Sequence, residues 1–166
     1  MNQILAATIS TLSKSKDLLQ HLKDEQLCDA SVSPYYSCVG SHIRHILDFY
    51  DCIIHGLPNE LIDLTARKRD LRVQEDCAYA ISNVERILKS LENIEYEADK
   101  RLAVVDDLGQ GKMTVNYTLG ALLAQANSHT IHHYAIINYI LDALNIAFDD
   151  QSFGYNPTTP VGFTSN

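Results

Sequence analysis

The sequence lacks several features that would place it in large classes of protein. No apolar run approaches the roughly 20 residues that span a bilayer, and the N-terminal stretch MNQILAATISTLSKSK has no continuous apolar core of the kind found in signal peptides. Positive charge is scarce: 13 Lys and Arg residues against 21 Asp and Glu residues give a net charge of −8, which disfavours binding to the phosphate backbone of a nucleic acid. We therefore expect a cytoplasmic protein that binds neither membrane nor nucleic acid.

Several metal and nucleotide motifs are also missing. No HExxH motif occurs, no Glu is followed three residues later by His, and the glycine-rich stretch GQGK continues with Met113 instead of the Ser or Thr of a P-loop. The cysteines form no CxxC pair, so in a reducing compartment they are expected to be free thiols packed as small hydrophobic side chains. These cysteines are Cys28, Cys38, Cys52 and Cys77.

The residues that are present predict one helical domain spanning residues 1–166. The chain is 46% apolar and 20% charged, and its apolar positions recur with helical period in four segments. A turn-like stretch, DDLGQGK, lies between β-branched residues and predicts a short hairpin before the last helix. We expect an all-α fold, a four-helix bundle with this hairpin and an irregular tail over residues 148–166. The predicted helices are Ile4–Leu22, Val39 to the stop signals Gly56 and Pro58, Glu75–Ile94, and Thr118–Ala147 with Thr118 as N-cap.

Two histidines share one face of the predicted last helix. His129 and His133 are one turn apart and continue an apolar series with steps of three and four residues, which predicts core positions for both. A buried imidazole costs free energy unless its ring nitrogens find partners. One metal ion bound by both rings would meet this requirement, and so would a histidine-rich core patch with hydrogen-bonded rings. The series is Leu119, Leu122, Ala126, His129, His133, Ile136 and Ile140.

The second predicted helix adds further candidates. In VGSHIRHILDFYDC, His42 and His45 share a stripe with Cys52, and either histidine would face the pair on the last helix. Three histidines from two helices would bind a metal and leave positions open, as catalytic sites do. Asp48 would either orient a ring as a hydrogen-bond acceptor or be a solvent-facing charge. We interpret Cys52 as a packing residue.

Two stretches resemble the DinB-like (DinB/YfiT) proteins. HTIHHYAI is similar to the HxxHH stretch of their last helix, and GSHIRHILDFYDCIIHGL is similar to their second helix. The resemblance implies a four-helix bundle with a divalent metal on His45, His129 and His133, while His42 stays a competitor to His45. His132, the extra histidine of HxxHH, would support the ligands or contact another helix. The chain departs from the family at Ala135 and Ile136, where many relatives have Gly-Gln, and at Phe49 and Tyr50, where the branch often has a histidine.

The resemblance also implies a function. Characterised relatives are similar to thiol transferases and thiol-dependent isomerases, so we expect a metal-dependent enzyme that presents a low-molecular-weight thiol to an electrophilic small molecule. Zinc and nickel suit three imidazoles best, and manganese and iron are further candidates. A metal-dependent hydrolase and a non-catalytic bundle that binds a ligand or adventitious metal are the alternatives. A homodimer is expected in each case.

A short basic cluster lies between the second and third predicted helices. Acidic residues alternate with the basic ones, so its simplest interpretation is a solvated surface, and the alternative is an anion-binding lip beside the histidine pocket. The cluster consists of Arg67, Lys68, Arg69 and Arg72.

Overall fold

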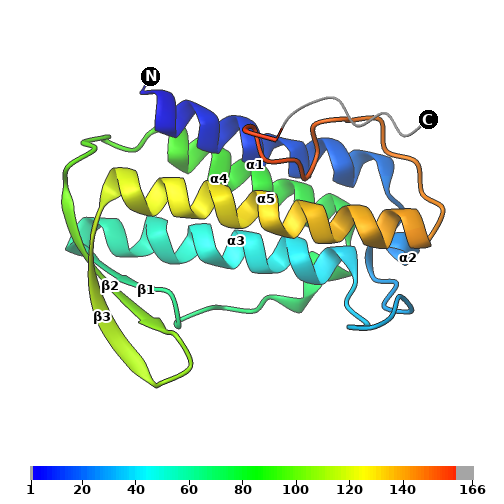
Figure 1. Ribbon diagram of the computed structural model, residues 1–166, viewed down its shortest axis with the longest axis horizontal. Coiled ribbons are helices and arrows are strands. Elements are labelled where there is room, and N and C mark those ends of the chain that lie inside the picture. Colours follow the sequence, from blue (N-terminus) through cyan, green and yellow to red (C-terminus); the bar gives the residue numbers. More distant parts are fainter. Residues whose placement is uncertain (1, 160–166) are drawn as a thin grey trace.

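The computed structural model describes residues 2–159 as a mainly helical chain with a small sheet (Figure 1). Four long helices lie side by side, with α1 against α4 and α5, and α3 against the same two helices. Each of the four predicted helices is confirmed, with ends within a few residues of those expected. The helices are α1 (Gln3–His21), α2 (Asp24–Leu27), α3 (Val39–Gly56), α4 (Cys77–Glu92) and α5 (Leu119–Ala143), with 3₁₀ turns η1 (Leu57–Asn59) and η2 (Leu71–Gln74).

The helix starts are fixed by side-chain caps. Thr118 caps α5, as predicted, because its Oγ1 accepts a hydrogen bond from the backbone N–H of Ala121 at 3.2 Å. Asp76 caps α4 in the same way. In α3 the capping atom is the sulfur of Cys38, which accepts from the N–H of Ser41 at 3.3 Å. These caps satisfy backbone N–H groups in the first turns of α3, α4 and α5.

A three-stranded sheet joins the helices, so the all-α expectation is incomplete. The predicted hairpin is confirmed as β2 (Arg101–Asp107) antiparallel to β3 (Lys112–Thr118). The third strand, β1 (Leu61–Asp63), pairs parallel with β2 and lies between the second and third predicted helices, where no strand was predicted. A strand of three residues with a distant partner gives no alternating pattern of its own.

The core side of α5 differs from the predicted series. Leu119, Leu122, Ala126 and Ile140 are buried, as predicted. In the middle of the helix Thr130 and Tyr134 are buried, whereas His129 and His133 are only half-buried. The hydroxyl groups of the two polar core residues are satisfied inside the core. Tyr134 Oη donates to the carbonyl of Thr11 at 3.0 Å, and Thr130 Oγ1 lies 3.2 Å from Tyr50 Oη. The prediction that the two histidines are core residues is therefore wrong. The core positions are the next residues along the chain, Thr130 and Tyr134, which lie about 100° further around the helix.

The segment after α5 has no helix or strand as far as Thr159, which confirms that part of the predicted irregular tail. Phe153 is fully buried and stacks on Tyr134 with the ring centroids 4.2 Å apart. The side-chain amide of Asn138 donates to the carbonyl of Phe153 at 2.6 Å. The rest of the predicted tail, residues 160–166, lies outside the described residues.

Every helix described between residues 2 and 159 is either too short or too polar to cross a bilayer.

Candidate metal centre

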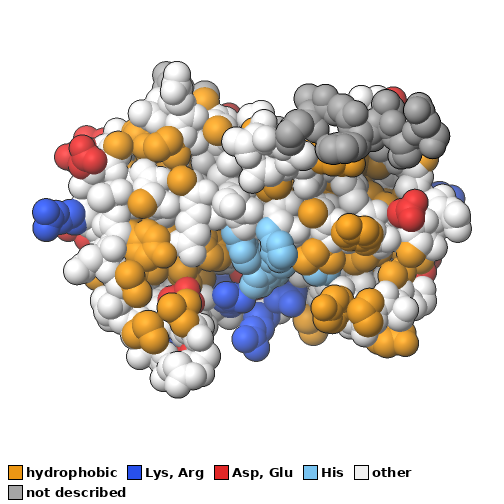
Figure 2. Space-filling model, viewed as in Figure 1, with side chains coloured by type: hydrophobic (Ala, Val, Ile, Leu, Met, Phe, Trp, Pro, Cys, Tyr) orange, Lys and Arg blue, Asp and Glu red, His pale blue; other side chains and the backbone are white. Residues whose placement is uncertain are grey.

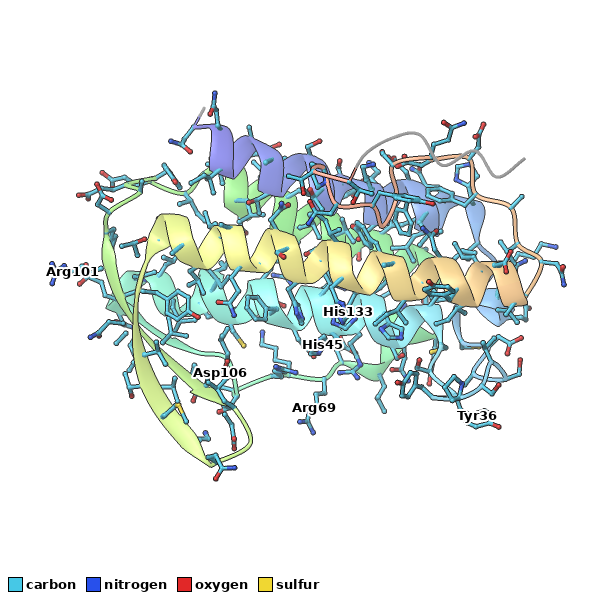
Figure 3. All side chains as sticks on the ribbon, in the orientation of Figure 1. Tyr36, His45, Arg69, Arg101, Asp106 and His133 are labelled. Carbon is cyan, nitrogen blue, oxygen red and sulfur yellow. The ribbon has the colours of Figure 1, made fainter. Side chains whose placement is uncertain are left out.

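Three histidine rings converge where α3 and α5 pack against each other (Figure 3). His45 comes from the middle of α3, and His129 and His133 come from successive turns of α5. One nitrogen from each ring lies within 4.8 Å of the other two. The Nε2 atoms of His45 and His129 are 3.0 Å apart, and the ring centroids of His45 and His133 are 4.7 Å apart.

The three rings lie at the edge of the helix contact instead of the interior. All three are half-buried, and Figure 2 shows histidine side chains reaching the surface next to a group of Lys and Arg side chains. On the inner side, the ring of Phe49 lies 5.0 Å from that of His129. The expectation of a cluster inside the helical core is therefore wrong, and the cluster is directly accessible to a small molecule.

The geometry of the cluster fits a single metal ion. Two imidazole nitrogens bound to one tetrahedral zinc at 2.0–2.1 Å are about 3.3 Å apart, close to the 3.0 Å that separates the Nε2 atoms of His45 and His129. The 4.8 Å limit for the whole set requires each side chain to move by less than about 1 Å. The metal itself stays a prediction.

The electrostatic environment keeps the rings neutral at pH 7. Burial lowers the pKa of His45 to about 4, and the nearby Arg67 guanidinium adds to this effect. Burial also lowers the pKa of His133 to about 3, with further contributions from His129 and His45. The pKa of His129 is lowered as well, mainly by burial. Neutral imidazole is the form that binds metals, because its free lone pair is the donor.

His42 lies behind His133 and can orient it. The Nδ1 atoms of the two rings are 2.9 Å apart, and Nε2 of His42 lies 2.9 Å from Ser37 Oγ. If His133 binds a metal through Nε2, its Nδ1–H donates to His42, whose own Nε2–H donates to Ser37. The geometry therefore groups His45, and not His42, with the pair on α5. His132 is exposed, with its ring 5.4 Å from that of His133.

Asp48 plays neither of its two predicted roles. Its carboxylate is buried instead of solvent-facing, and it accepts hydrogen bonds from Arg44 Nη1 at 3.1 Å and from the backbone N–H of Arg69 at 3.2 Å instead of from a histidine. Burial raises the pKa of this carboxyl group. Asp48 therefore fixes the loop that carries the basic cluster beside α3.

Arg67 is a site residue that the sequence did not identify. Its Nη1 donates to Nδ1 of His45 at 3.0 Å, and its Nε donates to the carbonyl of Leu64 at 3.0 Å. The anion-binding lip considered for the basic cluster was the nearest prediction. The available signal was a run of three cationic residues, 67–69, in a chain of net charge −8.

The cysteines lie outside the cluster. All four are free thiols, as predicted, although Cys28 is exposed instead of packed. Cys52 is buried and lines a separate hollow with Asp51 and His55. Burial raises the pKa of the Cys52 thiol to about 11, so the reactive thiolate is scarce at neutral pH. These observations support the interpretation of Cys52 as a packing residue.

Comparisons with protein-family models, with curated proteins and with solved structures find no match for this chain.

Proposed function

We propose that this protein is a metal-dependent enzyme of the DinB-like group, and that its four long helices form the bundle typical of that group. The observation that carries the proposal is the convergence of His45, His129 and His133, three neutral imidazoles from two helices, at a surface that a small molecule can reach. The two quoted motifs support the same assignment. These three residues would hold a divalent metal, and zinc or nickel suits them better than manganese or iron.

The proposed activity is transfer of a low-molecular-weight thiol to an electrophilic small molecule. A dication bound by three imidazoles has open positions, and there it lowers the pKa of a bound thiol or water. The protein supplies the positioning: His42 and Ser37 hold the His133 ring, and Phe49 covers the inner side of His129. We expect no nucleophile from Cys52, because its thiol is buried with a raised pKa.

Metal content tests the first half of this proposal. The protein is purified without a histidine tag, loaded separately with zinc, nickel, manganese and iron, and analysed for metal per chain. We expect one equivalent of zinc or nickel in the wild type and in His55→Ala, an exposed histidine on α3 that serves as control. His129→Ala should lose stoichiometric metal. Absence of stoichiometric metal from the wild type would end the enzyme proposal in favour of a non-catalytic helical protein.

Thiol binding tests the second half. Cobalt is loaded in place of the native metal, and a panel of small thiols is added while the visible and near-ultraviolet spectrum is recorded. Thiolate coordination should add a charge-transfer band that saturates with thiol concentration. If metal binds and no thiol changes the spectrum, thiol transfer is wrong and metal-dependent hydrolysis becomes the leading candidate.

We further propose that the protein is a homodimer. Tyr139 on α5 is 78% exposed, and a second copy of the chain would cover this ring. Sedimentation equilibrium should give twice the 18.6 kDa mass of one chain. A monomer at micromolar concentration would contradict this assignment without affecting the metal centre.

A further inference from the structure

The basic segment beside the histidine cluster has three consecutive cationic residues, Arg67, Lys68 and Arg69. Among the ion pairs of residues 2–159, none involves Arg67, Lys68 or Arg69. The arginines on either side, Arg44 and Arg72, each pair with an aspartate four residues later in the chain. In a chain with 21 acidic residues, a run of three unpaired cations is unexpected for a simple solvated surface.

This segment borders the candidate metal centre directly. Arg67 contacts the His45 ring at 3.0 Å, and Figure 3 shows Arg69 on the loop that passes beside His45. In Figure 2 the histidine patch and a group of basic side chains are adjacent on the same face. A small molecule bound at the three histidines would therefore also meet Arg67.

Hydrogen bonds to Asp48 and Leu64 hold the loop that carries the basic segment against α3. Asp48 accepts from the backbone N–H of Arg69, and the carbonyl of Leu64 accepts from Nε of Arg67. With Nε bound to Leu64, the Nη1 atom of Arg67 points at Nδ1 of His45. Arg69 and Lys68 are exposed. Lys68 lines the separate hollow beside Cys52, and the Arg69 side chain points away from His45 in Figure 3, so Arg67 is the cation that faces the cluster.

The contact between Arg67 and His45 depends on which ring nitrogen carries the hydrogen. Arginine is always a donor, so Nδ1 of His45 accepts, and the single hydrogen of the neutral ring is on Nε2. A metal bound at Nε2 requires that hydrogen on Nδ1 instead. Metal binding therefore removes the acceptor of Arg67 Nη1 and makes the guanidinium available to another acceptor.

We propose that Arg67 forms an oxyanion subsite that binds a carboxylate or phosphate group of the small-molecule substrate. As a substrate subsite it rests on the proposed function. A guanidinium matches these groups because its parallel N–H donors can bind two oxygens at once. The net charge of −8 repels large polyanions, which restricts the ligand to a small anion.

The first test needs no metal. The Nε–H of Arg67 is engaged by Leu64 and should give a slowly exchanging side-chain signal in ¹H–¹⁵N spectra. Inorganic phosphate and malonate are titrated separately into chelator-treated and zinc-loaded protein at low salt. We expect saturable movement of this signal with at least one of the two anions, and their order of affinity identifies the preferred oxyanion.

Charge-neutral variants provide the controls. Arg67→Gln should weaken anion binding about tenfold, the value of one charge-assisted hydrogen bond. Arg101→Gln removes an exposed cation at the far end of the molecule and should leave the affinity unchanged (Figure 3). A linear, unsaturated response, or equal weakening by Arg101→Gln, overturns the subsite.

The second test links the subsite to the metal. In the cobalt-loaded protein, mercaptoacetate, which carries a carboxylate, should bind about tenfold more tightly than neutral 2-mercaptoethanol, and Arg67→Gln should remove this preference. Equal affinity for the two thiols in the wild type refutes the subsite and leaves the thiol function standing. If phosphate binds saturably but the protein binds no metal, Arg67 forms an anion site and the proposed metal-dependent enzyme is refuted.

Discussion

The ring nitrogens of the clustered histidines face different partners, and these partners separate ligands from supporting residues. His45 and His129 face each other through Nε2, whereas His133 turns its Nδ1 to His42. His42 in turn contacts Ser37, a residue just before α3. A supporting residue of this kind fixes the tautomer and orientation of a metal ligand without touching the metal.

Replacing His42 tests this separation. His42→Ala should weaken zinc binding by about 10- to 100-fold while the stoichiometry stays at one, because the ligand loses its orienting partner and keeps its lone pair. Competition with a chromophoric chelator measures the affinity. His132→Ala, an exposed neighbour of His133, is the matched control and should change the affinity less than threefold. Complete loss of zinc from His42→Ala would instead make His42 a ligand.

The lowered histidine pKa values predict how stability depends on pH. Between pH 6.5 and about 4 the unfolded chain protonates His45 and His133 while the folded chain keeps both neutral. The unfolded state then binds more protons, so the free energy of unfolding decreases as the pH falls through this window. Asp48 contributes in the opposite direction because burial raises its pKa.

Urea unfolding in the presence of a chelator, at pH 7 and at pH 4.5, measures this effect. His133→Gln removes one of the lowered pKa values, so its loss of stability between the two pH values should be smaller than that of the wild type. Identical losses would show that the His133 ring is not shielded from protons in the folded chain.

At the scale of elements, the sequence predicted the helices and the hairpin, because these depend on patterns among neighbouring residues. Helix periodicity and the Thr118 cap located the four long helices, and the turn residues located the hairpin. The strand β1 was missed because its pairing with β2 is a long-range contact. In the middle of α5 the buried positions are 130 and 134 instead of 129 and 133, because a series with 3.5-residue period drifts by about 20° per heptad around a straight helix. Thr130 and Tyr134 were overlooked as core residues because their hydroxyl partners lie on other helices.

The three ligand candidates were predictable because two of them share one helix and the third lies in a motif. The contact of Arg67 with His45 was not predictable, because it depends on how the loop between η1 and η2 folds back onto α3. The same limit applies to Asp48, whose partners include a backbone N–H of that loop.

The contact between α3 and η2 depends on a glycine. A Cβ added at Gly40 would lie 2.5 Å from the backbone oxygen of Gln74, which cannot move independently of η2. Gly40→Ala should therefore lower the free energy of unfolding by about 1–3 kcal/mol. Gly120→Ala, whose nearest contacts are at 3.2 Å, is the comparison and should cost less. Urea unfolding of both variants checks this order, and equal or reversed costs would contradict the packing described here.

At the scale of the whole molecule, the segment after α5 returns along the helices and completes the core. Phe153 packs on Tyr134, and Lys14 of α1 pairs with Asp150 at 2.8 Å. Figure 1 shows this segment running back over α1 and α5. The histidine cluster and the Tyr134 ring lie on different faces of α5, because His133 and Tyr134 are adjacent residues and therefore about 100° apart around the helix.

Phe153→Ala tests whether the tail stabilises the whole fold. Removal of a fully buried aromatic side chain should cost about 3–5 kcal/mol, measured as a shift of the urea midpoint. Tyr155→Ala, which removes a ring that is 61% exposed, should cost less than about 0.5 kcal/mol. If the two variants are equally stable, the tail does not contribute to the core.

Anomalous diffraction from crystals grown with zinc is the most direct test of the central claim, that three imidazoles from α3 and α5 share one metal ion. Data collected above and below the zinc absorption edge locate the ion without assumptions about the protein. We predict one peak about 2.1 Å from a ring nitrogen of each of His45, His129 and His133. No peak between these rings at saturating zinc, or a peak bound by His42 or His132 instead, would contradict the account.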